Sequence, residues 1–278
     1  MGVITGATIH INYKIFGFKA VAHILITVDS RQAEQLFKHL EGLPEVFSAY
    51  SRGIKGHIDV VAILRTLEQL NEITDSIKSK FLILDIKTAI WTDVKEMNDN
   101  LAIIKENRRN AETISSINRT DNKSKIVIDE IDQKIADKLA ENGRISMDAL
   151  GKELGLSLDT TKRRYEKLKK SGVLKVTIQV NPKEMGYRAM CVFFTVTSNE
   201  KSMTIIEEIS KIPDVISIMK TAGNYDLEIW AMVQDIDELL TIQEEIEKTP
   251  GISRIDLEIL RLERWEKWPS PKQYISTF

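Results

Sequence analysis

Residues 17–28 read GFKAVAHILITV, and residues 186–197 read GYRAMCVFFTVT. The glycine, aromatic, basic and alanine residues that open the first stretch recur in the same order in the second, 169 positions later. Each stretch continues into an apolar run rich in β-branched and aromatic residues, which predicts a buried strand. The two ends of the chain therefore carry copies of one domain.

The repeat extends well beyond these two stretches. Ordered agreement at glycine, proline and aspartate argues against chance similarity between Ile- and Val-rich segments, and each copy has the length of an ordinary domain. The further matches are Gly2-Val3-Ile4 with Gly172-Val173-Leu174, Asn12 with Asn181, Pro44-Glu45-Val46 with Pro213-Asp214-Val215, and Gly56-x-x-Asp59 with Gly223-x-x-Asp226.

Within each copy the hydrophobic period alternates between strand and helix. The strands lie at 23–28 and 58–64, and again at 190–196 and 227–233. The order β-α-β-β-α-β predicts a four-stranded antiparallel sheet with both helices on one face, the ferredoxin-like arrangement. The other face needs cover, and we expect it to pair with another such sheet. The helical stripes are Ala33, Leu36, Phe37 and Leu40 after a cap at Ser30, then Leu67, Leu70, Thr74 and Ile77, and in the second copy Ile205, Ile206 and Ile209, then Leu239, Ile242 and Ile246.

A linker and a helical domain separate the two copies. Residues 98–125 are polar with few apolar side chains, which indicates a fraying helix followed by a solvated linker. In residues 126–180 the apolar spacing predicts three helices, with Ser146 and Ser157 as N-caps and Gly155 ending the second helix. The predicted fold class is α+β, with ferredoxin-like βαββαβ domains at 1–97 and 181–278 flanking this three-helix domain.

The third helix has a strongly basic outer face. Six of the fourteen residues from Ser157 to Lys170 are basic, while Leu158, Thr161, Tyr165 and Leu168 are expected to face inward. A helix that enters the major groove needs short hydroxyl side chains near its start and long cations that reach bases and phosphates. A solvated surface helix is the alternative. The predicted contacts to double-stranded DNA are Ser157, Thr160, Lys162, Arg163, Arg164 and Lys167.

Several separated motifs carry a family resemblance. They are Ile128-Asp129-Glu130-Ile131-Asp132, Asn142-Gly143-Arg144-Ile145-Ser146, Leu154-Gly155-Leu156-Ser157 and Thr221-Ala222-Gly223-Asn224-Tyr225-Asp226-Leu227. Residues 126 to about 265 resemble a complete Lrp/AsnC transcription regulator, a helix-turn-helix followed by a ligand-binding domain. The resemblance implies a sequence-specific DNA-binding protein that forms homodimers or larger homo-oligomers and responds to a small molecule such as an amino acid. Residues 1–97 look like a second ligand-binding domain without its helix-turn-helix.

The resemblance also implies that the Gly-x-x-Asp loops lie near an effector site at a subunit interface. The amides of such a turn can face a carboxylate, and Asp226 can receive an ammonium group. A simple turn capped by Asp226 is the alternative. The candidate ligand-binding residues are Gly223, Asn224, Tyr225 and Asp226 in the second copy, and Gly56, His57 and Asp59 in the first.

Composition and charge narrow the class of protein. With 42% hydrophobic and 29% charged residues the chain is typical of a globular protein. Cys191 has no cysteine to pair with, and the apolar runs are too short to cross a bilayer, so we expect a cytoplasmic protein without a membrane partner. Basic residues exceed acidic ones in 98–180, whereas acidic ones dominate in 181–278. Contact with a polyanion is therefore expected at the centre of the chain.

Two other functions stay open. One is an enzyme of the sirohaem decarboxylase type, whose fold is Lrp-like; the other is a ligand-binding assembly module without specific DNA binding. All four histidines precede residue 58, so the Lrp-like unit lacks an imidazole base and a metal site. We therefore predict no enzyme activity, cofactor or metal. His23 and Cys191 are interpreted as structural, and Asp256 and Glu258 as a solvated strand face.

The two ends of the chain carry further expectations. Trp265 and Trp268 are expected to pack on their own sheet, with anchoring to a neighbouring subunit as the alternative. Met1-Gly2-Val3-Ile4 occupies the place where a helix-turn-helix would end. The hypothesis is a tandem of two regulators whose first helix-turn-helix was lost or lies upstream of Met1. Retention of this strand because it pairs in a dimer is the alternative.

Overall fold

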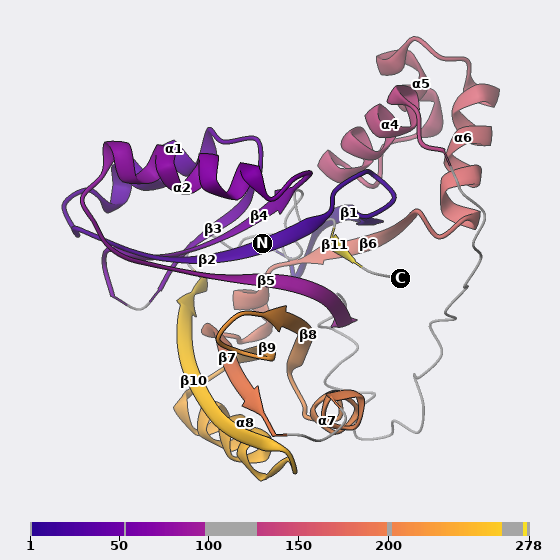
Figure 1. Cartoon of the computed structure of the whole chain (residues 1–278). Coiled ribbons are helices and arrows are strands. Elements are labelled where there is room, and N and C mark those ends of the chain that lie inside the picture. Colours follow the sequence, from indigo (N-terminus) through magenta and orange to yellow (C-terminus); the bar gives the residue numbers. More distant parts are fainter. Residues whose placement is uncertain (1, 53, 98–126, 199–201, 263–274, 277–278) are drawn as a thin grey trace.

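The computed structural model describes residues 2–52, 54–97, 127–198, 202–262 and 275–276. Two halves built from sheets and helices face each other, and a helical lobe lies beside them (Figure 1). The predicted linker at 98–125 and the tail residues Trp265 and Trp268 lie outside the described residues. None of the described helices is long and apolar enough to span a membrane.

The first half is a ferredoxin-like βαββαβ unit, as predicted. Its strands lie in the order β5-β2-β4-β3, and both helices cover the outer face of the sheet (Figure 1). Apolar residues of the helices and of the outer sheet face form one core, which includes Ile24, Leu36 and Ile58. The elements are β2 (Ala20–Val28), α1 (Ala33–Glu41), β3 (Val46–Ser51), β4 (His57–Leu64), α2 (Glu68–Lys80) and β5 (Ile83–Met97).

The second half repeats this unit. Its strand order is β10-β7-β9-β8, and its outer core includes Phe193, Ile229 and Ile242. Every residue of β9 is buried because helices cover one face of the strand and the first half covers the other. The elements are β7 (Ala189–Thr197), α7 (Ser202–Ile209), β8 (Val215–Ala222), β9 (Leu227–Val233), α8 (Ile236–Lys248) and β10 (Ile252–Arg261), preceded by the 3₁₀ turn Pro182–Met185.

Two details of the first half differ from the prediction. Helix α1 begins at Ala33, and its N-cap Gln32 makes no side-chain cap, so Ser30 is not the cap residue. In α2 the buried positions are Ile73 and Ile77, whereas Leu67 is 60% exposed. The predicted positions Ile77 and Leu70 do face the core, but Leu67 is the N-cap residue outside the helix, and Ile73 rather than Thr74 is the buried residue of the middle turn.

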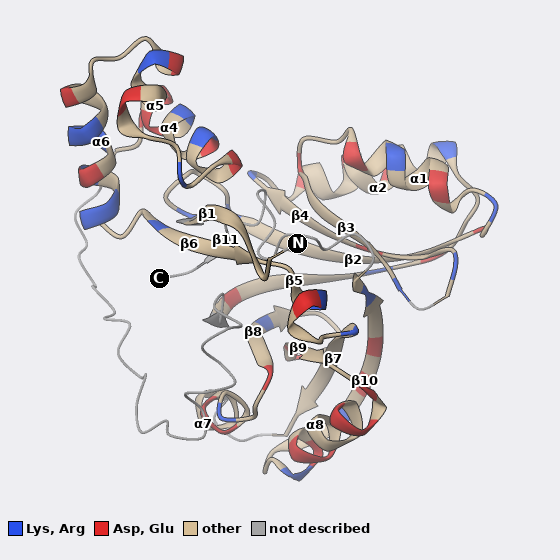
Figure 2. Cartoon of the chain, turned by 180° about the vertical axis from the view of Figure 1, so that it is seen from behind, with Lys and Arg blue, Asp and Glu red and all other residues tan. Residues whose placement is uncertain are grey.

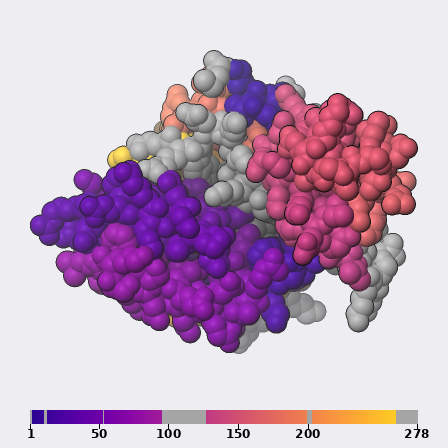
Figure 3. Space-filling model, turned by 90° about the horizontal axis from the view of Figure 1, so that it is seen from above, coloured from indigo at the N-terminus to yellow at the C-terminus, as the bar shows by residue number. Residues whose placement is uncertain are grey.

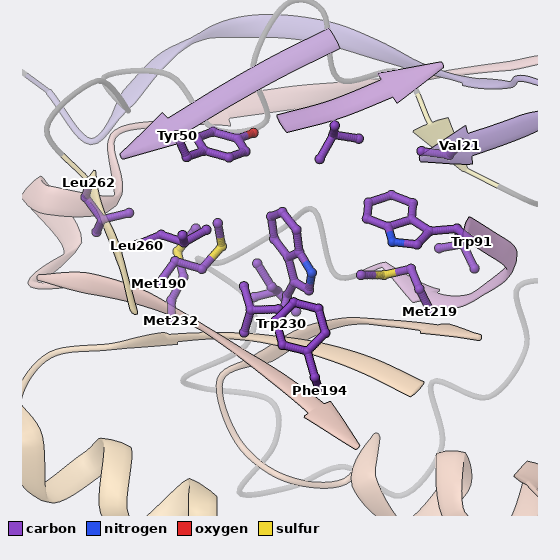
Figure 4. Packing of buried hydrophobic residues seen from close by; sticks show 14 of the residues in the cluster. Val21, Tyr50, Trp91, Met190, Phe194, Met219, Trp230, Met232, Leu260 and Leu262 are labelled. Atoms are coloured by element: carbon purple, nitrogen blue, oxygen red, sulfur yellow. The ribbon is translucent and has the colours of Figure 1, made fainter. Parts of the chain in front are cut away.

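The sheets of the two halves pack face to face within one chain. Strands β5 and β8 pair antiparallel, and on the opposite side a bridge joins Arg52 to Leu260. The inner faces enclose a second apolar core, in which Trp91 and Trp230 from opposite halves lie with their ring centroids 6.0 Å apart (Figure 4). The predicted sheet-on-sheet cover is therefore supplied by the other half of the same chain.

A single offset of 169 residues relates the strand registers of the halves. Asp59 is paired with Tyr50 on β3, and Glu228 is paired with Met219 on β8, each 169 positions later. The structural equivalent of Asp59 is therefore Glu228, not Asp226 as the glycine motifs suggested. The two turns have equal length, and their glycines simply occupy different positions within them.

The central domain has the three predicted helices, α4 (Glu130–Glu141), α5 (Met147–Leu154) and α6 (Leu158–Lys170). The Ser146 and Ser157 hydroxyls cap α5 and α6, and Gly155 ends α5 with a φ of 67°. Both predicted caps and the glycine stop are confirmed. A separate apolar core, which includes Ile135, Leu150 and Leu168, holds the helices together.

The helical lobe rests on a ribbon formed by strands from both halves. Strand β1 (Ile4–Asn12) pairs antiparallel with β6 (Leu174–Val180) and parallel with β11 (Ile275–Ser276). The Gly143 amide donates to the Ala7 carbonyl at 2.8 Å, and the Thr8 hydroxyl donates to the Ala140 carbonyl at 2.7 Å. A Cβ on Gly143 would lie 2.9 Å from the backbone of β1, so this contact requires glycine. From above, N-terminal residues lie at the junction between the lobe and the first half (Figure 3).

Candidate nucleic-acid interface and effector loops

The N-terminus of α6 presents two of the predicted DNA contacts. The Ser157 hydroxyl accepts from the Thr160 amide at 3.2 Å and donates to the Thr160 hydroxyl at 2.9 Å. Ser157 is exposed and Thr160 half-buried. These bonds fix the first turn of the helix and leave the remaining capacity of both hydroxyls on the outside.

The predicted cations of α6 fall into two sets. Lys162 and Arg163 are exposed, and neither forms an ion pair with any residue that the structure describes. Lys167 lies 3.4 Å from the Asp132 carboxylate, with its side chain about half exposed. Basic and acidic segments alternate along the ribbon of α6 (Figure 2). Leu158, expected to face inward, is 39% exposed.

Arg164 forms ion pairs within the helical domain, unlike Lys162 and Arg163, and its contact with DNA stays a prediction. Its guanidinium Nη1 lies 2.7 Å from the Asp129 carboxylate and 2.8 Å from that of Asp132, which is fully buried. The Asp132 amide and the Arg164 guanidinium both donate to Asp129 and hold the pKa of its carboxyl below the usual value. Arg164 thus ties α6 to the start of α4 rather than projecting from it.

In the second Gly-x-x-Asp loop, the aspartate side chain binds the end of the neighbouring strand β7. The Asp226 carboxylate accepts from the Thr197 amide at 2.7 Å and from the Thr197 hydroxyl at 3.1 Å. Gly223 has a φ of 143° and Asn224 is exposed. The Tyr225 ring packs on Phe194, with the centroids 5.1 Å apart. The Asp226 carboxylate therefore ties the β8–β9 turn to the end of β7, and its contact with a ligand stays a prediction.

The first loop differs from the second. Gly56 has a φ of 92°, and a Cβ there would meet the Val28 carbonyl at 2.5 Å, so glycine is required by close approach. His57 is half-buried at the start of β4. Asp59 is fully buried, and its carboxylate faces the interior between the two halves rather than the loop. The three candidate residues therefore do not converge on one open site.

Asp59 belongs to a set of charged groups between the halves, all buried except Glu258, which we call the interdomain polar cluster. It comprises His23, Arg52, Asp59, Glu228 and Glu258. His23 Nδ1 lies 2.9 Å from Glu228 Oε1, and His23 Nε2 lies 3.3 Å from Asp59 Oδ2. Arg52 Nε lies 2.8 Å from Asp59 Oδ1, and its Nη1 lies 2.8 Å from Glu258 Oε1.

The indoles and the imidazole complete this cluster. Trp91 Nε1 donates to Glu228 Oε2 at 2.9 Å, and Trp230 Nε1 donates to the other oxygen of the same carboxylate. Burial alone would lower the pKa of His23, but Glu228 and Asp59 outweigh it and raise that pKa to about 10. His23 is therefore an imidazolium at neutral pH.

The cluster was only partly foreseen. The sequence predicts a structural His23 and a solvated Glu258, but Glu258 is 33% exposed and ion-paired with Arg52. The available signal was an acidic residue inside each of two otherwise apolar strands, Asp59 in β4 and Glu228 in β9.

Other chemically active groups are few. Across the described ranges, no three His, Cys, Asp or Glu side chains gather so as to hold a metal ion. Cys191 is buried, which raises the pKa of its thiol to about 12 and makes it a poor nucleophile.

Comparison with known proteins agrees with this architecture. Residues 128–169 match the AsnC-type helix-turn-helix domain, and residues 190–261 match the Lrp/AsnC ligand binding domain. The chain is 30% identical to regulatory protein AsnC of Escherichia coli K12 over 115 residues, which cover 41% of this chain and 76% of the other. It is 26% identical to the HTH-type transcriptional regulator FL11 of Pyrococcus furiosus over 127 residues, covering 45% and 84%.

A solved structure extends the likeness to nearly the whole chain. The siroheme decarboxylase NirDL superposes on 93% of this chain and 76% of its own, with a TM-score of 0.63 at 14% identity, which shows a shared fold. The helix-turn-helix, the ligand-binding domain and the AsnC sequence together identify the chain as a member of the Lrp/AsnC family of transcriptional regulators.

Proposed function

We propose that the protein is a sequence-specific regulator of transcription that inserts α6 into the major groove of double-stranded DNA. The observation that carries this proposal is the capped helix α6, with Lys162 and Arg163 exposed on a lobe that stands beside the rest of the molecule. Such a helix supplies a rigid start, long cations and an apolar back. The test is selection of bound DNA from a random pool at fixed salt, with and without pooled amino acids.

The pooled amino acids test for an effector. We propose that the protein is cytoplasmic and that a small molecule acts on it through the second ligand-binding domain. The match to a ligand-binding domain over residues 190–261 supports this. Because Asp226 already accepts two hydrogen bonds from Thr197, an ammonium group bound there would have to share that carboxylate. A change in the selected sequences or in their affinity on adding amino acids would identify the class of effector.

Catalysis of the decarboxylase type is the second candidate, favoured by the whole-chain likeness in fold. His23, the histidine at the centre of the molecule, is fully buried and held between two carboxylates, so it is unsuited to act as a base on a substrate. We therefore propose a non-enzymatic role. Two results together would favour the enzyme. The protein would bind an iron porphyrin with a stable absorbance band, and the selection would yield no DNA whose electrophoretic mobility the protein changes.

Arg163→Ala should weaken binding to the selected DNA by about 1–3 kcal/mol without changing the thermal midpoint of the protein. Arg163 is exposed and has no ion pair within the described part of the chain, so its loss removes only a DNA contact. Arg164→Ala should instead lower the melting temperature of the helical lobe, because it leaves the buried Asp132 with less compensation. Fluorescence anisotropy with labelled DNA and calorimetry separate the two effects.

Lys248→Ala serves as the control, since Lys248 is exposed on α8 in an i,i+4 ion pair far from α6 in sequence. Equal affinities for Arg163→Ala and Lys248→Ala would remove α6 from the DNA interface.

Tight binding to a palindromic operator should require two chains. The described residues of one chain contain one helix-turn-helix, and one such head covers one half-site. Light scattering of the complex with a palindrome should give two chains per duplex, and with an isolated half-site one chain. Tight binding of the palindrome by one chain per duplex would contradict this prediction.

A further inference from the structure

We propose that the interdomain polar cluster restricts each half of this chain to pairing with the other half, so that the inner sheet face of the second domain rejects a copy of itself. The inner face is the sheet surface that carries Trp230 and Met232 in the second half, and Val61 and Ile63 in the first. This concerns the choice of partner at a protein interface and is independent of DNA binding.

The two halves are related by a pseudo-two-fold axis, so each residue of the cluster can be compared with its equivalent in the other half. Asp59 and Glu228 occupy equivalent positions on β4 and β9, and His23 contacts Asp59 within its own half and Glu228 across the interface. The residue equivalent to His23 is Val192, since the strand pairs His23↔Val61 and Val192↔Trp230 differ by the same 169 positions. The cation thus comes from the first half alone.

Pairing of two second halves would create an uncompensated pair of carboxylates. The same symmetry would set Glu228 against its own copy, with Val192 in the place of the imidazolium. It would also replace Trp91 by its equivalent Leu260, because Val21↔Trp91 corresponds to Met190↔Leu260. Each Glu228 would lose His23 and the Trp91 donor. A buried charge that loses its partners is strongly disfavoured.

Pairing of two first halves would instead leave an excess of buried cations. It would bring together two copies each of His23, Arg52 and Asp59, with two more cations than carboxylates. The mixed pair alone sets His23 and Arg52 against carboxylates from both halves. Like-charge repulsion and unpaired buried groups against the wrong partner are the established means of specificity at interfaces.

Two cysteine reporters distinguish the pairings in the full chain. Ile90 and Ala222 are direct strand partners across β5 and β8, so Ile90→Cys/Ala222→Cys reports the mixed pair. Ile259 is equivalent to Ile90, so Ile259→Cys/Ala222→Cys reports pairing between two second halves. Within one chain β7 and β9 separate β10 from β8. Both reporters carry Cys191→Ala, because Cys191 is the chain's one cysteine and is opposite Ile259.

In the otherwise unchanged chain, the first reporter should oxidise within the chain and migrate as a monomer on non-reducing electrophoresis. The second reporter should stay reduced. Replacing the cluster by apolar residues (His23→Val, Arg52→Met, Asp59→Leu and Glu228→Leu) should then let the second reporter form covalent dimers, at least about tenfold above the background of the unchanged chain. Circular dichroism confirms that the replaced chain is folded.

If the fourfold variant does not fold, Glu228→Gln takes its place in the crosslinking test. It removes the charge but keeps the shape and hydrogen-bonding capacity of the side chain. It should raise the dimer yield of the second reporter severalfold. Covalent dimers of the second reporter in the unchanged chain would overturn the proposal. The same holds if folded variants still yield none, because shape alone would then select the partner.

Discussion

Replacing Glu228 with alanine should lower the free energy of unfolding by about 3–5 kcal/mol, the range expected when one member of a buried ion pair is removed. The Glu228 side chain is fully buried, forms an ion pair with His23 through Nδ1 and accepts hydrogen bonds from two indole N–H groups. Its loss leaves an imidazolium with Asp59 as its remaining close carboxylate, two indole donors without an acceptor, and a cavity between the sheets. All three effects act in the same direction.

Chemical denaturation followed by tryptophan fluorescence measures this change, since Trp91 and Trp230 touch the site. Glu258→Ala is the matched control. It removes a carboxylate from the same cluster, but Glu258 is 33% exposed, and Arg52 keeps its contacts with Asp59 and the Ile26 carbonyl. We expect a loss of about 1 kcal/mol there. Similar losses for the two variants would mean that Glu228 does not carry a buried charge.

The free energy of unfolding should fall as the pH rises from about 6.5 to about 10. The pKa of His23 is raised to about 10 in the folded chain, whereas an unfolded histidine titrates near 6.5. Between these values the folded state holds one proton more than the unfolded state, so the stabilisation is complete below pH 6.5 and is lost as the pH approaches 10. The expected slope is about 1.4 kcal/mol per pH unit.

The charged groups that face His23 and its neighbours are Glu228 on β9, Asp59 on β4, Arg52 after β3 and Glu258 on β10. The difference between the wild-type chain and His23→Gln isolates the contribution of His23 from theirs. Denaturation curves at intervals from pH 6.5 to 9.5 should show the slope in the wild type and a slope smaller by about one proton in the variant. Parallel curves would show that His23 is neutral in the folded chain.

The elements that depend on local signals were predicted correctly. Strands such as β2 and β9 follow from apolar runs, and the caps at Ser146 and Ser157 follow from hydroxyls placed before amphipathic stretches. Ser30 failed because a residue suited to capping does not fix where a helix begins. Here a turn precedes the helix, in which the Arg31 and Gln32 amides donate to Asp29, so the helix starts two residues later than a cap at Ser30 would allow.

The sheets and their face-to-face packing were predicted, but individual side-chain contacts between residues far apart in the sequence were not. Arg164 lies on the polar side of α6 by helical spacing, but only the docking of α4 brings Asp132 within reach of it. Similarly, His23 and Glu228 are more than two hundred residues apart, and nothing local links them. The glycine motifs even suggested the wrong partner for Asp59, because a turn glycine marks backbone conformation and not strand register.

The contacts between the helical lobe and β1 link the affinity for DNA to the relative position of the two halves. Strand β1 leads into the first half and β6 into the second, so the Gly143 and Thr8 contacts tie the DNA-reading helices to the relative position of both halves. An effector that binds one arrangement of the β1/β6 ribbon more tightly than another shifts the chain toward that arrangement. The affinity for DNA can then change by at most the ratio of the effector's affinities for the two arrangements. By reciprocity, DNA changes the affinity for that effector by the same factor. We therefore expect any coupling between an effector and DNA in this chain to act through the β1/β6 ribbon.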